Sequence, residues 1–148
     1  MTKHSTLITT APQIADLALQ HRKAPIISFD TEFIRENTFF PVVELLQVAT
    51  ETDSWLVDVQ AFRQGRGHRL DDLRPLLDVF TDPSILKILH AAQGDQECLY
   101  TAFGIVASPS LDTAVAGSLL GYGENIGLGN LTKSVLGVTL KKGHGRTN

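Results

Sequence analysis

The order of the short apolar segments constrains the fold of this chain more than any other feature of its sequence. Three runs typical of strands come close together, and beyond the loop 64–67 such runs alternate with segments whose apolar residues recur at helical spacing. Closely spaced strands pair antiparallel, whereas strands joined through a helix pair parallel. The pattern predicts a mixed sheet with helices on its faces, which is the α/β class.

Proline residues and a polar turn mark the limits of the early strands. Pro25 opens the first run, Pro41 breaks the chain before the second, and the turn 51–54 makes the second and third a hairpin. The three runs are 26–30, 45–50 and 55–59. A helix is predicted ahead of them, from Thr10 to about Arg22, because Thr10 and Gln13 have capping-box spacing.

The second half of the chain is punctuated by glycines that follow helical patterns. Gly104, Gly121 and Gly137 each come after such a pattern and predict a helix end. The predicted helices cover about 70–80, 94–103, 112–121 and 128–136, and the predicted strands are 85–90 and 106–111. No repeat or linker interrupts this order, so we expect residues 1–148 to form a single domain.

The composition is that of an ordinary globular chain and excludes several classes of protein. Of the 148 residues, 43% are hydrophobic and 20% are charged, with a net charge of −3. Disordered chains have fewer apolar residues and a larger net charge. The acidic balance also argues against binding nucleic acid through bulk positive charge, although bound cations would supply positive charge locally. The basic segment 141–146 is the best candidate for direct contact, and a solvated tail is the alternative.

The sequence carries no signal for export or membrane insertion. It has no run of about 18 apolar residues, and its first residues lack the apolar core of a secretory signal. The single cysteine, Cys98, cannot form an internal disulfide and lies in an apolar helical pattern, so we expect a buried thiol. These features predict a cytoplasmic protein.

Two carboxylates follow the first predicted strand. Asp30 and Glu32 are two residues apart and therefore point to the same face of an extended chain. Two like charges at this spacing repel, and a divalent cation, which prefers oxygen ligands, removes the conflict. A solvated acidic turn is the alternative, since this pattern is common.

A third carboxylate, Asp95, follows a later apolar run and begins a predicted helix. Asp is also favoured at helix N-termini because it interacts with free backbone N–H groups, so a capping role is the alternative. Adjacent central strands bring their ends to one rim of a sheet, where α/β proteins place their sites. We therefore expect Asp30, Glu32 and Asp95 to meet in one metal-binding cavity.

Four blocks of sequence, taken together and in order, resemble the ribonuclease D family of DEDD exonucleases. They are Phe29–Phe33, Glu44–Ala49, His90–Leu99 and Leu111–Thr113. The resemblance runs from about Ile27 to the end of the chain. It implies a ribonuclease H-like fold and a 3′–5′ exoribonuclease, with single-stranded RNA 3′ ends as partner and DNA as a further candidate substrate.

The resemblance also implies roles for individual residues. Asp30 and Glu32 match the family's first motif and Asp95 its second, as ligands of two Mg²⁺ or Mn²⁺ ions that promote hydrolysis of the last phosphodiester. The product would be a nucleoside 5′-monophosphate, in tRNA or other RNA 3′-end processing. Thr31 and Phe33 are expected to contact the terminal nucleotide, with a core position as the alternative for Phe33.

Four further residues are weaker candidates. His90 is expected either to contact substrate or to be a hydrogen-bonded structural histidine, and Asp112 to cap the helix that follows it. Arg35 and Lys133 are candidates for phosphate contacts, with a solvated face as the alternative for each.

The family's third motif, Tyr-x-x-x-Asp, is not found. Neither Tyr100 nor Tyr122 has Asp four residues later, and the chain ends at Asn148. We therefore expect an exonuclease domain that is incomplete at its C-terminus, without its last helix, without helical RNA-binding domains, and with weak or absent activity. A homodimer that covers exposed apolar surface is a further expectation. The alternative hypothesis is a catalytically impaired nucleic-acid-binding or interaction module on the same scaffold.

Overall fold

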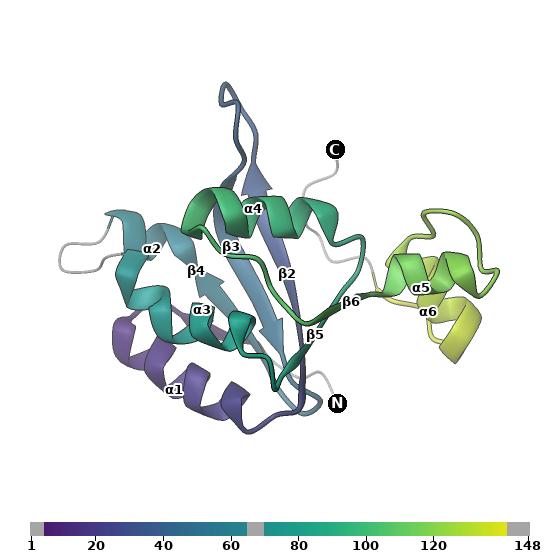
Figure 1. Cartoon of the computed structure of the whole chain (residues 1–148), viewed down its shortest axis with the longest axis horizontal. Coiled ribbons are helices and arrows are strands. Elements are labelled where there is room, and N and C mark those ends of the chain that lie inside the picture. Colours follow the sequence, from purple (N-terminus) through teal and green to yellow (C-terminus); the bar gives the residue numbers. More distant parts are fainter. Residues whose placement is uncertain (1–4, 65–69, 142–148) are drawn as a thin grey trace.

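The computed structural model describes residues 5–64 and 70–141 and contains one six-stranded sheet (Figure 1). The strand order is β1-β4-β3-β2-β5-β6, so the long strand β2 lies near the middle. The strands are β1 (Thr6–Ile8), β2 (Ile26–Ile34), β3 (Val42–Ala49), β4 (Ser54–Asp58), β5 (Leu86–Leu89) and β6 (Ser110–Asp112). The helices are α1 (Ala11–Arg22), α2 (Val59–Gln64), the 3-10 helix η1 (Leu70–Leu73), α3 (Arg74–Thr81), α4 (Gln93–Phe103), α5 (Thr113–Leu119) and α6 (Leu128–Leu136).

The sheet is mixed, as predicted. Strands β2, β3 and β4 form an antiparallel meander, with Asp30 opposite Gln47 and Val48 opposite Trp55. Strand β5 then pairs parallel with β2, and β6 pairs parallel with β5. A register shift between Glu32 and Phe33 interrupts the β2–β3 ladder where β2 leaves the body of the sheet.

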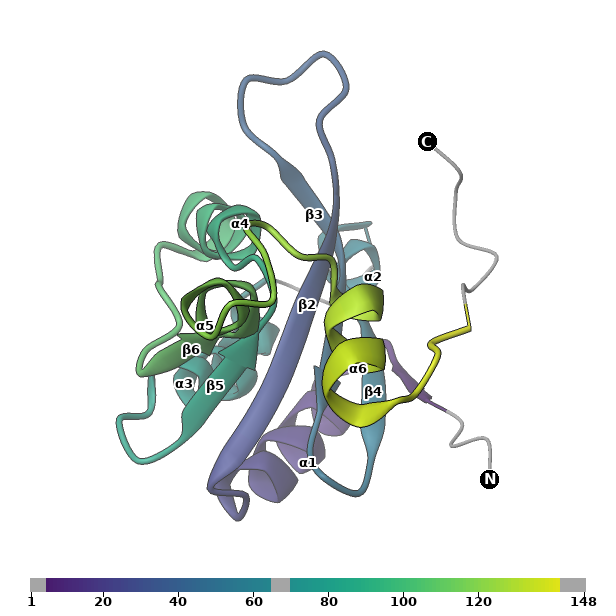
Figure 2. The same ribbon diagram turned by 90° about the vertical axis from the view of Figure 1, so that its right-hand side faces the viewer.

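Helices α3 and α4 lie on one side of β2, and α6 lies on the other (Figure 2). On the first side the rings of Phe29 from β2 and Phe80 from α3 stack, with centroids 4.5 Å apart, in the core. Helix α1 packs against α3 and buries Ile14 and Leu17 there. Beyond β6, α5 and α6 pack on each other at one end of the molecule (Figure 1).

Several predicted local features are confirmed. The Gln13 side chain accepts hydrogen bonds from the backbone N–H of Thr10 at 3.1 Å, as a capping box requires, and of Thr9 at 2.9 Å. Gly104 and Gly137 follow α4 and α6 with φ near +70°, which suits glycine. Cys98 is a buried free thiol. Within the described ranges, no helix combines the length and apolarity needed to cross a bilayer.

Three elements differ from the prediction, and one of them is the strand predicted at 106–111, which covers only Ser110–Asp112. Strand β1 was not predicted, and it pairs parallel with β4 at the edge of the sheet. Val59 was assigned to a strand, but it begins α2, because the Asp58 carboxylate accepts a hydrogen bond from the backbone N–H of Ala61 at 3.2 Å and starts a helical turn. Most of the predicted loop 64–67 and of the basic segment 141–146 lies outside the described residues.

A buried lysine joins two loops beneath β5. The Lys87 side chain is fully buried, and its Nζ donates hydrogen bonds to the carbonyls of Asp82 and of Ser108, the latter at 2.9 Å. The Lys87 backbone N–H also bonds the carbonyl of Pro109 at 3.0 Å. Desolvation lowers the pKa of the Lys87 ammonium, and the negative charge of the Asp82 carboxylate raises it by a smaller amount. This lysine therefore holds the loops before and after the β5–α4 unit together.

Candidate metal centre

Strand β2 presents the carboxylates of Asp30 and Glu32 to one face of the sheet and the hydroxyl of Thr31 to the other. Ile27, Phe29 and Thr31 are buried on the face that carries α3 and α4, whereas Asp30 and Glu32 are exposed on the other. The prediction that Asp30 and Glu32 share a strand face is therefore confirmed. Thr31, which was expected to contact the terminal nucleotide, is turned into the protein between them.

Asp95 lies in the first turn of α4 and is bound to β2 through Thr31. Its Oδ1 accepts hydrogen bonds from the Thr31 backbone N–H at 2.9 Å and from the Thr31 hydroxyl at 2.6 Å. Asp95 is 6% exposed, so these bonds are shielded from water. The Thr31 hydroxyl thus holds the Asp95 carboxylate in place beside β2.

The Asp95 carboxyl is in an environment that disfavours its charge. Its pKa is raised to about 6, first by burial and then by the neighbouring Asp30 carboxylate, while the hydrogen bonds from Thr31 act in the opposite direction. The Thr31 backbone N–H that bonds to Asp95 follows Asp30 directly in the chain, so Asp95 on α4 lies beside the part of β2 that carries Asp30. An anion that is destabilised in this way is stabilised by a nearby cation.

The three predicted ligands do not form one cluster in the part of the chain that the structure describes. In residues 5–64 and 70–141, no three side chains of His, Cys, Asp and Glu lie close enough together to hold a metal ion. The expected meeting of Asp30, Glu32 and Asp95 in one cavity is therefore not seen there, although the Thr31 N–H joins Asp95 to β2 beside Asp30. A metal-ligating role for Glu32 stays a prediction.

The turn between β5 and α4, which leads to Asp95, is held by a carboxylate from β6. Asp112 accepts hydrogen bonds from the backbone N–H groups of Ala91 at 2.9 Å and Ala92 at 2.8 Å, and it caps α5 through Ala114 at 2.8 Å. Ala91 has φ of +54°, a conformation that an L-residue rarely adopts without such support. The predicted cap is confirmed, and its second role at the turn was not predicted.

His90 makes a hydrogen bond with each ring nitrogen. Nδ1 is 2.8 Å from the Thr113 hydroxyl, and Nε2 is 2.8 Å from the carbonyl oxygen of Ile126. The structural alternative for this histidine is therefore confirmed, while substrate contact by His90 stays a prediction. His90 and Asp30 also line one open cavity of about 660 Å³.

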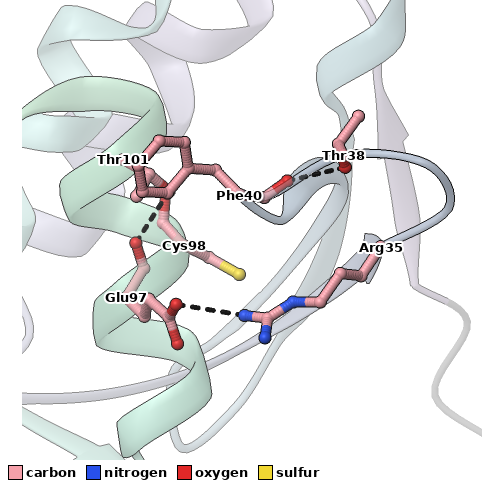
Figure 3. Close-up of polar contacts among 6 residues, drawn as sticks. All are labelled: Arg35, Thr38, Phe40, Glu97, Cys98 and Thr101. Carbon is pink, nitrogen blue, oxygen red and sulfur yellow. Dashed lines mark hydrogen bonds and ion pairs between the residues drawn. The ribbon is translucent and has the colours of Figure 1, made fainter.

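The remaining candidates occupy the surface. Phe33 is 41% exposed, so it is not a core residue, and its ring lies close to Gly94 at the start of α4. Arg35 donates a hydrogen bond to the Glu97 carboxylate at 3.0 Å and forms an ion pair with it (Figure 3). Lys133 is exposed on α6. Nucleotide or phosphate contacts by these three side chains stay predictions.

Asp95→Asn is expected to stabilise the metal-free protein at neutral pH. The folded-state pKa of Asp95, about 6, exceeds its unfolded value of 3.8. The protonated carboxyl therefore contributes to the stability of the fold fully below about pH 4, and this contribution is lost as pH rises through 6. Above pH 6 the charge destabilises the fold by about 1–3 kcal/mol. Asn keeps an acceptor for Thr31 and carries no charge. Urea unfolding in EDTA should show a gain at pH 7.5 that disappears near pH 4, and a loss of stability at pH 7.5 would contradict the assignment.

Comparison with known proteins decides the family of this chain. The family model described as 3′–5′ exonuclease matches residues 6–148. The chain belongs to the 3′–5′ exonuclease family. Ribonuclease D of Sphingobium indicum is 41% identical over 93% of the chain, and that of Nitrobacter hamburgensis is 35% identical over the same share. The matched region is 34% of each relative, so the chain spans about a third of their length.

Solved structures agree with this family assignment. The crystal structure of Escherichia coli RNase D, described as an exoribonuclease involved in structured RNA processing, superposes with a TM-score of 0.85 at 32% identity, over 98% of this chain and 36% of that one. Trypanosoma brucei RNase D in complex with RNA U12 shares the fold, with a TM-score of 0.81 at 19% identity over 94% of this chain and 49% of that one. The mixed sheet is thus the ribonuclease H-like sheet of the exonuclease family.

The residues of this exonuclease-family chain fit the divalent-metal dependence that the family implies. Asp30 and Asp95 offer oxygen ligands, which hard divalent cations prefer, and Mg²⁺ usually takes only one or two protein carboxylates. Burial, and then the charge of Asp30, raises the pKa of Asp95, and a bound cation would stabilise the charged carboxylate. The chain's own donor chemistry therefore matches a divalent cation.

Proposed function

We propose that this chain is the catalytic core of a metal-dependent 3′–5′ exoribonuclease of ribonuclease D type. It would hydrolyse the terminal phosphodiester of single-stranded RNA and release nucleoside 5′-monophosphates in RNA 3′-end processing, with Mg²⁺ or Mn²⁺ as cofactor. The observation that carries the proposal is the pair of hydrogen bonds from Thr31, next to Asp30 on β2, to the Asp95 carboxylate on α4, which join two elements far apart in sequence. The names of the relatives, all ribonuclease D, support the choice of RNA.

Each residue of the site has a distinct part in this proposal. Bound cations would supply a water of lowered pKa and neutralise charge on the phosphate. Asp30 and Asp95 would hold them, with Glu32 as a further ligand. Thr31 is a positioning residue, because its two hydrogen bonds fix the carboxylate of Asp95. Asp112 acts one step further away, because it holds the turn from which α4 begins.

The test is the pattern of products from a 5′-labelled single-stranded RNA. With Mg²⁺ or Mn²⁺, the full-length band should shorten one nucleotide at a time, mass spectrometry should find nucleoside 5′-monophosphates, and EDTA should stop the reaction. A circular RNA of the same sequence has no 3′ end and should stay intact. Internal cleavage, or turnover in EDTA, would contradict the proposal. RNA binding without cleavage would favour the non-catalytic module instead, and a DNA strand of equal length tests the need for the 2′-hydroxyl.

A further inference from the structure

We propose that the cleft between the β2–β3 hairpin and α4 binds nucleotides that lie on the 5′ side of the terminal one in a single-stranded RNA. This inference rests on the proposed exonuclease function and adds a second subsite to it. The cleft has a volume of about 890 Å³. One wall is the hairpin segment 38–42, and the other is the end of α4, residues 100–104, with Arg63 from α2 between them.

Aromatic side chains are unusually exposed at this cleft. Phe39, Phe40 and Tyr100 are 88%, 57% and 64% exposed, although most aromatic surface is buried in folded domains. The rings of Phe39 and Phe40 meet edge to face, with centroids 4.9 Å apart. Such rings stack with nucleic-acid bases whatever the base, and each stack contributes about 1–3 kcal/mol. The exposed rings therefore favour an unpaired nucleic-acid strand as the occupant.

Two guanidinium groups lie beside these rings. Arg63 lines the cleft, and Arg35 leaves β2 near its mouth, where it pairs with Glu97 (Figure 3). The side chains of Arg35 and Glu97 are 50% and 44% exposed, and a salt bridge at such exposure contributes about 0–1 kcal/mol. The Arg35 guanidinium can therefore leave the Glu97 carboxylate and bind a phosphate with little loss of stability. Rings with adjacent guanidinium groups are the combination that single-strand binding proteins use.

The cleft lies along the same two elements as the carboxylate pair. Strand β2 carries Asp30 and then runs into the hairpin, and α4 carries Asp95 in its first turn and Tyr100 near its end. Tyr100 is five positions after Asp95 in the helix, which is roughly 8 Å along the axis. An enzyme that holds the 3′-terminal nucleotide at the carboxylates can only meet the preceding nucleotides elsewhere on its surface. This cleft lies next along both elements.

The experiment measures RNA binding in EDTA, where no cation contributes and no hydrolysis occurs. Fluorescence anisotropy of an eight-nucleotide RNA is compared between the wild type and Phe39→Ala. Because Phe39 is 88% exposed, its loss should leave the thermal midpoint unchanged. We expect binding to weaken by about fivefold or more, from the loss of one base stack. Leu119→Ala on α5, which removes a side chain that is 83% exposed, is the matched control and should bind like wild type.

Arg63→Ala supplies a second, independent measurement. It should reduce the dependence of binding on salt concentration by about one phosphate contact. The inference is overturned if both variants bind the RNA as wild type does, even where metal-dependent release of nucleotides is normal. Conversely, weaker binding by Phe39→Ala in a chain that hydrolyses nothing would uphold the cleft and refute the exonuclease proposal. No RNA binding by the wild type in EDTA would also overturn it.

Discussion

Asp30→Ala is expected to reduce the metal-dependent release of nucleotides by about a thousandfold. The Asp30 carboxylate approaches Asp95 and faces the cavity that His90 also lines. Metal ions stabilise a phosphoryl transition state by several kcal/mol, and about 4 kcal/mol corresponds to a thousandfold in rate. Removing the Asp30 carboxylate, which would share the bound cations with Asp95, should cancel most of this stabilisation. Initial rates in Mn²⁺ with a labelled RNA give the measurement.

A second readout separates loss of the site from loss of the fold. Without Asp30, one of the causes that raise the pKa of Asp95 is gone, so the Asp95 carboxyl should titrate at a lower pH, which NMR can follow. Asp78→Ala removes an exposed carboxylate on α3 and serves as the matched control, with unchanged turnover. Full activity in Asp30→Ala would refute the metal centre described here.

Lys87→Ala is expected to lower the free energy of unfolding by about 3–5 kcal/mol. The ammonium donates to the carbonyls of Asp82 and Ser108, and its removal leaves the part-buried Ser108 carbonyl without a donor, at about 1–3 kcal/mol, while the Asp82 carbonyl keeps only its bond from the Ile85 N–H. The loss of the buried aliphatic stem adds to this. For a chain of this length the expected fall in thermal midpoint is about 10 °C, measured by circular dichroism.

Two further lysine variants identify the cause of that loss. Lys133→Ala removes an exposed lysine from α6 and should change stability by no more than about 0.5 kcal/mol. Lys87→Met fills the same space without a donor, so it should retain part of the lost stability but remain below the wild type. A Lys87→Met protein as stable as the wild type would show that packing, rather than the two hydrogen bonds, is what Lys87 contributes.

Most of the fold could be predicted because its elements carry local signals. The apolar run before Asp30, the turn 51–54 and Gly104 each mark an element limit that depends on nearby residues alone. Strand β1 has no such signal, because three residues are too few for a pattern and its pairing with β4 spans almost fifty residues. Val59 was placed in a strand since a β-branched residue after an apolar run suits one, and the capping by Asp58 decided otherwise.

The candidate site could be predicted only in part. The residue types and the family resemblance pointed to Asp30 and Asp95, and strand alternation placed Asp30 with Glu32. The bond from Thr31 to Asp95 could not be foreseen, because it joins residues 64 positions apart and depends on how α4 packs on β2. The bond from Asp112 to the turn before α4 could not be foreseen either, because it also joins residues far apart in the sequence. The capping of α5 is by itself enough to explain an aspartate at this position.

The Asp112 carboxylate links the movement of the pair α5–α6 to the turn before α4. It bonds at once to the turn ahead of α4 and to the first turn of α5, and His90 bonds to Thr113 and to the chain just before α6. The pair α5–α6 therefore cannot shift against the sheet without disturbing the turn from which α4 begins. Any coupling that these bonds carry is reciprocal, so a ligand bound at α5–α6 and one bound at the carboxylates would change each other's affinity by the same factor.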